Sequence, residues 1–123
     1  MFNLIVIKKK NICIMGLMGS GKSIIGKDLS VYLNLDFYDT DKEIEIKEKR
    51  NINKIFEENG ETYFRNIEEK ICVKLLARTN CIISLGGGSI INNKIRNVIN
   101  ENSYSIYLKV KFDNLVSLSL IHI

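Results

Sequence analysis

Residues 16–23 read G-L-M-G-S-G-K-S, which fits the phosphate-loop pattern G-x-x-x-x-G-K-[ST]. Gly16 and Gly21 let the backbone approach phosphate groups closely, so that its amide N–H groups surround the β-phosphate. Lys22 can reach the β- and γ-phosphates, and the Ser23 hydroxyl suits Mg²⁺. The pattern therefore predicts a nucleoside triphosphate site. Its candidate residues are Gly16, Met18, Gly19, Ser20, Gly21, Lys22 and Ser23.

Two carboxylates, Asp39 and Asp41, follow the second apolar segment of the chain. In an open α/β sheet, ligands bind outside the carboxyl ends of the strands. One carboxylate could therefore face Mg²⁺ while the other faces an acceptor hydroxyl. The alternative is that one of them caps the following helix, and capping and ligand contact can coexist in one residue.

Arg65 and the triple glycine 86–88 are the remaining candidates. Three glycines at the end of a strand allow the backbone to approach a ligand closely, although they also suit a flexible turn. An isolated arginine on a helix is most often solvated, so Arg65 alone is weak evidence for a binding site.

Apolar runs and helical periodicities alternate along the chain, which predicts an α/β fold with a mainly parallel sheet. Gly60 is expected to separate a short helical turn from a long amphipathic helix. The predicted strands are 11–15, 35–38, 81–85 and 104–110. The predicted helical segments are 20–34, 39 to about 51, 53–59, 61–78, 90–100 and one starting near 112.

Composition narrows the class of protein. The 123 residues fit one domain, and no apolar run is long enough to predict a membrane span. The net charge is +4, and the basic residues are spread along the chain apart from the three consecutive lysines 8–10. No nucleic-acid partner is therefore expected. The N-terminal apolar segment precedes these lysines, the reverse of a secretory signal, and predicts a cytoplasmic protein. Cys13, Cys72 and Cys81 are an odd number without close pairing, which argues against a disulfide framework.

Four sequence blocks follow one another in the order and at the spacing of a known family: residues 16–23, 37–41, 55–65 and 84–88. In these blocks the chain resembles the shikimate kinases, small P-loop kinases of the aromatic amino acid pathway. The resemblance spans most of residues 12–110. It implies a three-layer P-loop kinase fold and transfer of the γ-phosphoryl group of ATP to the 3-hydroxyl of shikimate.

The resemblance also implies roles. Lys22 and Ser23 match the nucleotide and Mg²⁺ residues, and Asp39 matches an acid that helps to hold Mg²⁺ through water. Asp41 matches the acid that binds the ring hydroxyls of shikimate and accepts the proton. Arg65 matches an arginine that grips the shikimate carboxylate. Lys22, Asp41 and Arg65 are therefore the expected catalytic residues, and the backbone at Gly87 and Gly88 is expected to contact substrate.

The sequence departs from the family pattern near its end. Residues 1–123 are expected to form one P-loop kinase domain without the family's lid, last strand and C-terminal helix, leaving a strand order of 2-3-1-4. Residues 1–10 are expected to be an N-terminal extension, and the protein is expected to be a monomer. Weak activity and inactivity both stay open, as do a related small-molecule kinase such as a gluconate kinase and a non-catalytic remnant.

Overall fold

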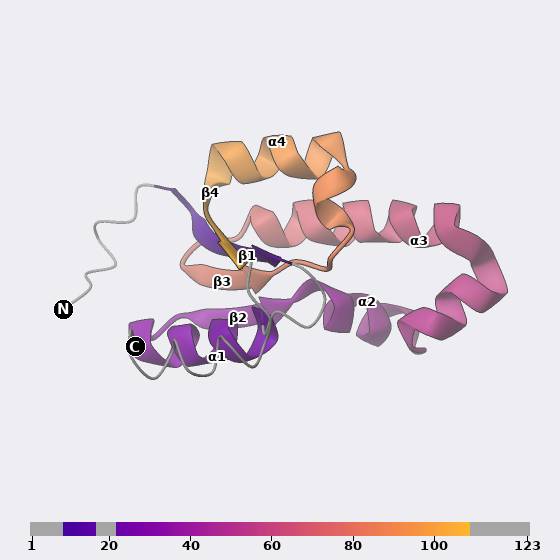
Figure 1. Cartoon of the computed structure of the whole chain (residues 1–123), viewed down its shortest axis with the longest axis horizontal. Coiled ribbons are helices and arrows are strands. Elements are labelled where there is room, and N and C mark those ends of the chain that lie inside the picture. The colour runs from indigo at the N-terminus through magenta and orange to yellow at the C-terminus, as the bar shows by residue number, and fades with distance from the viewer. Residues whose placement is uncertain (1–8, 17–21, 109–123) are drawn as a thin grey trace.

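A computed structural model describes residues 9–16 and 22–108. A four-stranded sheet lies at its centre, with the strand order β2-β3-β1-β4 and parallel pairing throughout the described strands (Figure 1). The strands are β1 (Asn11–Gly16), β2 (Asp36–Asp39), β3 (Cys81–Ser84) and β4 (Ser103–Leu108). The helices are α1 (Lys22–Leu33), α2 (Thr40–Glu48), α3 (Ile52–Leu76), the short 3₁₀ helix η2 (Ser89–Ile91) and α4 (Asn93–Asn102).

The two faces of the sheet bury different helices because side chains alternate along each strand. Ile12, Ile14 and Ile82 face α1, which packs on them through Leu29 and Leu33. The opposite face holds the larger core, to which α2, α3 and α4 contribute. That core consists of Cys13, Ile44, Ile55, Phe64, Ile71, Cys72, Leu75, Leu76, Cys81, Ile83, Leu85, Ile95 and Ile99. The result is the predicted three-layer arrangement.

The predicted break at Gly60 is present as a kink in α3. Gly60 has φ 84° and ψ 175°, a conformation that disfavours any residue with a side chain. Asn51 caps the first half of α3 by accepting a hydrogen bond from the Lys54 amide at 2.8 Å. The second half buries Phe64, in agreement with the predicted amphipathic face.

Several boundaries differ from the predictions. The helix predicted over 90–100 is two elements, because Asn92 leaves the helical conformation and its side chain caps α4 through the Ile95 amide. The strand order 2-3-1-4 is confirmed. The helix predicted from residue 112, most of the proposed extension 1–10 and phosphate-loop residues 17–21 lie outside the described residues. Within the described part of the chain, no helix is long and apolar enough to cross a membrane.

A buried polar side chain ties the sheet to the end of α3. Asn11 is almost fully buried, and its amide donates to the carbonyl oxygens of Leu76 at 2.8 Å and Arg78 at 2.9 Å. Its carbonyl oxygen accepts from the Ser103 hydroxyl at the start of β4. The buried amide is therefore satisfied, and it aligns β1 with both neighbouring segments.

Candidate active site

The described part of the phosphate-binding region lies where β1 ends and α1 begins. The Lys22 ammonium donates a hydrogen bond to the Gly16 carbonyl oxygen at 3.2 Å, so the side chain folds back over the end of β1. The Ser23 hydroxyl donates to Asp39 Oδ2 at 2.6 Å. Four candidate residues from two separate motifs are thereby placed together.

Asp39 accepts three hydrogen bonds because it stands at the junction of β2 and α2. While Oδ2 accepts from Ser23, Oδ1 accepts from the amides of Asp41 at 3.0 Å and Lys42 at 3.3 Å. Asp39 is therefore the N-cap of α2, and its other oxygen contacts Ser23, the last residue of the phosphate motif. This capping is one of the two alternatives for the acidic pair, and Asp39 combines it with the contact to Ser23 on the nucleotide side.

Asp41 lies in the first turn of α2, with its carboxylate directly against Gly86. A Cβ atom at position 86 would overlap with Asp41 Oδ1, so a side chain there would displace this carboxylate. Burial, together with the nearby carboxylates of Asp39 and Glu68, raises the pKa of Asp41 to about 6. Lys22 acts in the opposite direction. A carboxyl group with this pKa can take up and release a proton near neutral pH.

Thr40, between the two aspartates, is fully buried. Its hydroxyl oxygen accepts a hydrogen bond from the Gly86 amide at 3.0 Å. Thr40, the first residue of α2, thus fixes the backbone of Gly86. The next residue, Asp41, packs against the same glycine.

Arg65 approaches the other end of the triple glycine. A Cβ at Gly88 would come within 2.6 Å of Arg65 Nη1, so the guanidinium lies directly over the backbone of Gly88. Nη1 donates to Glu68 Oε1 at 2.9 Å, and Nε lies 3.6 Å from Glu61 Oε2. Within the described part of the chain, Nη2 makes no hydrogen bond or ion pair, so the guanidinium keeps donors for an anion.

Glu68 supports this arginine from the core. Its side chain is buried, and Oε2 accepts from the Ser89 hydroxyl at 3.1 Å while Oε1 accepts from Arg65. A buried carboxylate is stable when its oxygens are paired in this way. Ser89, at the start of η2, also lies 3.8 Å from the Cys72 thiol.

The space over the middle glycine is open. Nothing lies within 4 Å of a Cβ built on Gly87, in contrast to both of its neighbours. A small hollow of about 40 Å³ adjoins this loop, and its lining includes Gly16, the first residue of the phosphate motif. The loop therefore lies beside the nucleotide side, with Asp41 against its first glycine and Arg65 over its last.

Sequence reasoning selected Asp41, Arg65, Gly87 and Gly88 but missed the groups that hold them. Thr40, Glu68 and Ser89 were not selected, and Gly86 was noted only as part of the triple glycine. One signal was available for Glu68, because it follows Arg65 by three residues and so lies on the same face of a helix. Nothing in the local sequence indicates that Thr40 and Ser89 are buried.

The fold and site together define a class. A parallel sheet of order 2-3-1-4, with a phosphate loop after β1 and acidic residues after β2, is the framework of P-loop kinases that act on small molecules. Comparisons with known proteins refine this class. The family model "Shikimate kinase" matches residues 18–119, and the chain belongs to this family.

Individual relatives agree with this assignment. The chain is 42% identical over 108 residues to a shikimate kinase of Bartonella quintana, covering 88% of this chain and 51% of that protein. Among solved structures, a shikimate kinase from Acinetobacter baumannii in complex with shikimate has a TM-score of 0.82 at 32% identity, covering 89% of this chain and 62% of that chain. The chain thus spans about half to two thirds of the length of these relatives.

A gluconokinase from Sinorhizobium meliloti is also similar, with a TM-score of 0.52 at 16% identity over 80% of this chain and 57% of that chain. At this identity the similarity shows a shared fold alone. The family assignment therefore rests on the shikimate kinases.

Proposed function

We propose that this chain transfers the γ-phosphoryl group of ATP to the 3-hydroxyl of shikimate. The observation that carries the proposal is the placement of Asp41 and Arg65 at opposite ends of one glycine loop, beside the end of β1. A group that can accept a proton and a group that can bind a carboxylate thereby lie on either side of Gly87, whose own Cβ position is open.

The acceptor side fits a small hydroxylated carboxylate. Arg65 presents a planar fork of donors, which suits a planar carboxylate better than a point charge does. The open space at Gly87 and the backbone at Gly88 would let the substrate approach the loop. Further support comes from the similar Acinetobacter baumannii enzyme, which was solved in complex with shikimate.

The donor side fits ATP with Mg²⁺. The Ser23 hydroxyl and the Asp39 carboxylate are hard oxygen donors 2.6 Å apart, the type of ligand that Mg²⁺ prefers. Within the described residues, no group of three or more His, Cys, Asp or Glu side chains could hold a metal. That agrees with an ion bound by few protein ligands and by the phosphates themselves. When bound, Mg²⁺ would neutralise charge on the β- and γ-phosphates.

The protein's own contribution is positioning and proton transfer. As the 3-hydroxyl oxygen forms its bond to the γ-phosphorus, the bond to the β-phosphate oxygen breaks and ADP leaves. The hydroxyl proton passes to Asp41, whose raised pKa makes it a suitable acceptor. Lys22 would stabilise the negative charge that develops on the phosphates.

The test is an ADP-release assay with ATP and Mg²⁺, run with shikimate, with gluconate and without acceptor. We expect shikimate-dependent release that Asp41→Asn reduces by at least about a hundredfold, the scale of a lost general base. Asp36→Asn, an exposed carboxylate at the start of β2, is the matched control and should retain activity. Release that depends on gluconate, or that is equal with and without acceptor, would overturn the proposal.

The proposal extends to a monomer in the cytoplasm without nucleic-acid or membrane partners. A kinase needs ATP, which the cytoplasm supplies. Sedimentation of the full chain with and without ADP would test the oligomeric state.

A further inference from the structure

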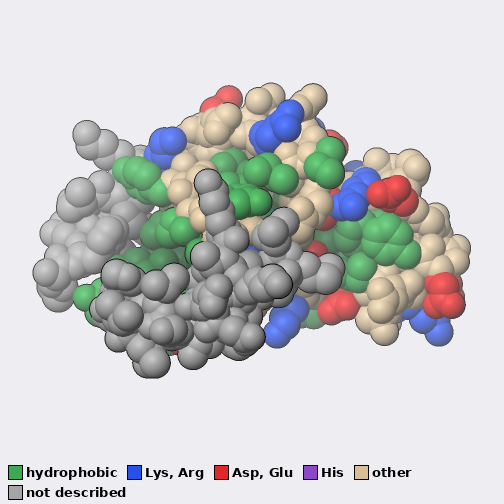
Figure 2. All heavy atoms as spheres, viewed as in Figure 1, with side chains coloured by type: hydrophobic (Ala, Val, Ile, Leu, Met, Phe, Trp, Pro, Cys, Tyr) green, Lys and Arg blue, Asp and Glu red, His purple; other side chains and the backbone are tan. Residues whose placement is uncertain are grey.

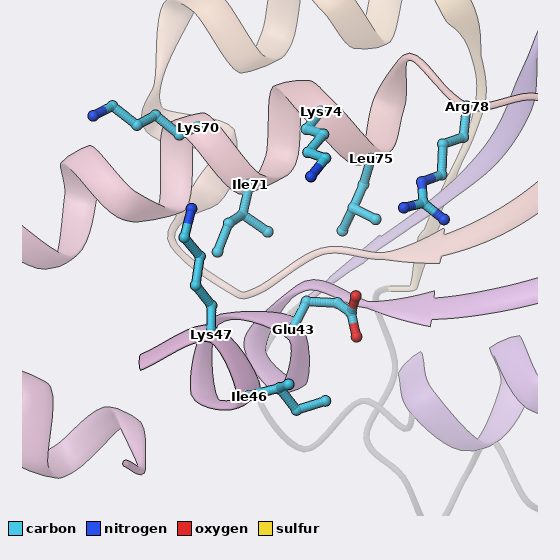
Figure 3. A pocket seen from close by; sticks show the side chains of 8 residues that line it. All are labelled: Glu43, Ile46, Lys47, Lys70, Ile71, Lys74, Leu75 and Arg78. Carbon is cyan, nitrogen blue, oxygen red and sulfur yellow. The ribbon is translucent and has the colours of Figure 1, made fainter. Parts of the chain in front are cut away.

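A groove of about 280 Å³ lies between α2 and α3, and none of the candidate active-site residues lines it (Figure 3). Its walls come from the middle and last turn of α2, from the last turns of α3 and from Arg78 just beyond α3. The lining residues are Glu43, Ile46, Lys47, Lys70, Ile71, Lys74, Leu75 and Arg78.

The groove is strongly cationic. Lys70, Lys74 and Arg78 recur every four residues, so they form one stripe along α3 and its end. Lys47 extends from α2 toward this stripe, and Lys74 points into the space between the helices (Figure 3). Glu43 is the one acidic residue among the eight that line the groove.

Across residues 9–16 and 22–108, no ion pair or hydrogen bond directly engages the ammonium groups of the groove lysines, Lys47, Lys70 and Lys74, although the charge of Lys47 acts on Glu48 beside it. Lys47 and Lys74 each lie in the last turn of their helix, where a cation is favourable. That explains each of them alone but not Lys70, which lines the same groove while its ammonium extends away from the other lining side chains (Figure 3). Like charges four residues apart destabilise a helix, and a bound anion would remove that repulsion.

Arg78 differs from the lysines because it is already fixed. Its guanidinium lies 4.7 Å from the centre of the Tyr38 ring and donates to the Tyr38 hydroxyl at 2.8 Å. It therefore closes one end of the groove with a positioned charge.

The rest of the groove is apolar. Ile71 and Leu75 are buried residues at its floor, whereas Ile46 on α2 is 70% exposed. An occupant with an apolar part would cover Ile46, and its charged group would meet the lysines. Apolar contact and cationic contact are thus available within one small volume.

We propose that this groove binds a small organic dianion, such as a phosphate monoester carrying an apolar ring. The occupant would bridge α2 to α3. These helices also carry Asp41 and Arg65, so binding would hold the two sides of the acceptor site together. The proposal does not depend on the identity of the acceptor.

The experiment uses phenyl phosphate as the probe, with the full chain labelled for amide NMR. ADP and Mg²⁺ are present throughout, so that the phosphate loop is occupied. We expect saturable shifts at amides of residues 43–47 and 70–78, and a weaker response to inorganic phosphate, which lacks the ring. Affinity should fall as salt is raised, because the lysines are exposed. Shifts confined to the neighbourhood of residues 22 and 23 would overturn the proposal.

Two variants act in opposite directions. Lys70→Gln with Lys74→Gln should weaken phenyl phosphate binding about fivefold or more, the scale expected from two exposed charge contacts. Glu43→Gln should tighten it about twofold, a gain that loss of stability cannot produce. Lys54→Gln with Lys94→Gln makes the same change in net charge at exposed sites elsewhere. If the groove variant and this control bind phenyl phosphate with equal affinity, the binding is general charge attraction and the proposed site is wrong.

Discussion

At the scale of single residues, the environment of Asp41 raises the pKa of its carboxyl group. Its carboxylate is packed on Gly86 and lies near two further carboxylates, those of Asp39 and Glu68. Lys22 offsets their effect in part. The folded protein therefore binds a proton at Asp41 more tightly than the unfolded chain does. This difference affects both stability and activity.

The stability consequence has a definite sign. The pKa of Asp41 rises from 3.8 to about 6 on folding, so the folded state binds this proton more tightly. The free energy of unfolding therefore falls as pH rises through this interval, and the loss persists above it. Asp41→Asn removes the charge and should raise stability by about 1 kcal/mol at pH 7.5, a figure reduced for partial exposure. At pH 4 the difference should nearly vanish. Urea unfolding at both pH values checks this, and a variant less stable at pH 7.5 would contradict it.

The activity consequence concerns the same proton. If Asp41 accepts the proton of the acceptor hydroxyl, it must be ionised beforehand. We expect kcat/KM for shikimate to fall about tenfold per pH unit below about pH 6. ADP affinity, measured over the same range, should change much less. A profile that stays flat down to pH 5 would remove Asp41 from this role.

Thr40 offers a separate test of the loop. Thr40→Val keeps the shape of the buried side chain but removes the acceptor of the Gly86 amide hydrogen bond. We expect about 1–3 kcal/mol lower stability, because a buried donor loses its partner. We also expect a higher KM for shikimate and an upfield shift of the Gly86 amide proton. Thr40→Ser should restore both the shift and the KM, and a valine variant with an unchanged KM would make Thr40 purely structural.

The residue scale also shows what sequence can predict. The phosphate motif, Asp39, Asp41 and Arg65 could be selected because their types and order form a pattern along the chain. Glu68 could not be given its place, since a glutamate on a helix is usually solvated and this one is buried by the packing of η2. Such burial is decided by contacts between distant segments.

At the scale of elements, the contact between α1 and β2 is as tight as any that the described glycines reveal. A Cβ at Gly26 would overlap with the ring of Phe37, so α1 reaches this close to the sheet only because position 26 has no side chain. The contact sets the distance between Ser23 on α1 and Asp39 at the end of β2.

Gly26→Ala tests this contact. We expect a loss of about 1–3 kcal/mol, typical of overpacking, despite the higher helix propensity of alanine. Adding Phe37→Leu should recover part of the loss, which a double-mutant cycle measured by urea unfolding would reveal as coupling. Additive effects of the two changes would show that they do not meet.

Element boundaries were less predictable than element types. All four strands were expected, because short apolar runs ended by glycine or polar residues are a strong local signal. The division between η2 and α4 was missed, since Asn92 was not recognised as a cap. Three positive-φ residues that end or join elements, Asn34, Lys49 and Asn80, likewise gave no clear advance signal, although asparagine tolerates this conformation.

At the scale of the whole molecule, one edge of the sheet collects the candidate site residues. Its carboxyl edge presents the phosphate loop after β1, the acidic pair after β2 and the triple glycine after β3. Figure 2 shows hydrophobic side chains between charged groups on the visible face, where grey atoms cover part of the surface. The active site thus draws residues from segments that are widely separated in sequence.

ADP should therefore stabilise the whole domain. With Mg²⁺ and ADP at one hundred times the dissociation constant, the free energy of unfolding should rise by about 2.7 kcal/mol. For a domain of this size, each kcal/mol raises the melting temperature by about 4–8 °C. Lys22→Met should abolish most of the shift. A broad transition that ADP does not move would favour the non-catalytic remnant.

The three cysteines give the protein a practical property. Burial raises the pKa of Cys13 and Cys72 to about 12 and that of Cys81 to about 11. At neutral pH fewer than about one in a thousand of these thiols would be ionised, and maleimide reagents need an accessible thiolate. A cysteine introduced at Ile91, which is 77% exposed beside the triple glycine, would thus be the preferred attachment point for a fluorophore. The native background needs no prior removal of cysteines for such labelling.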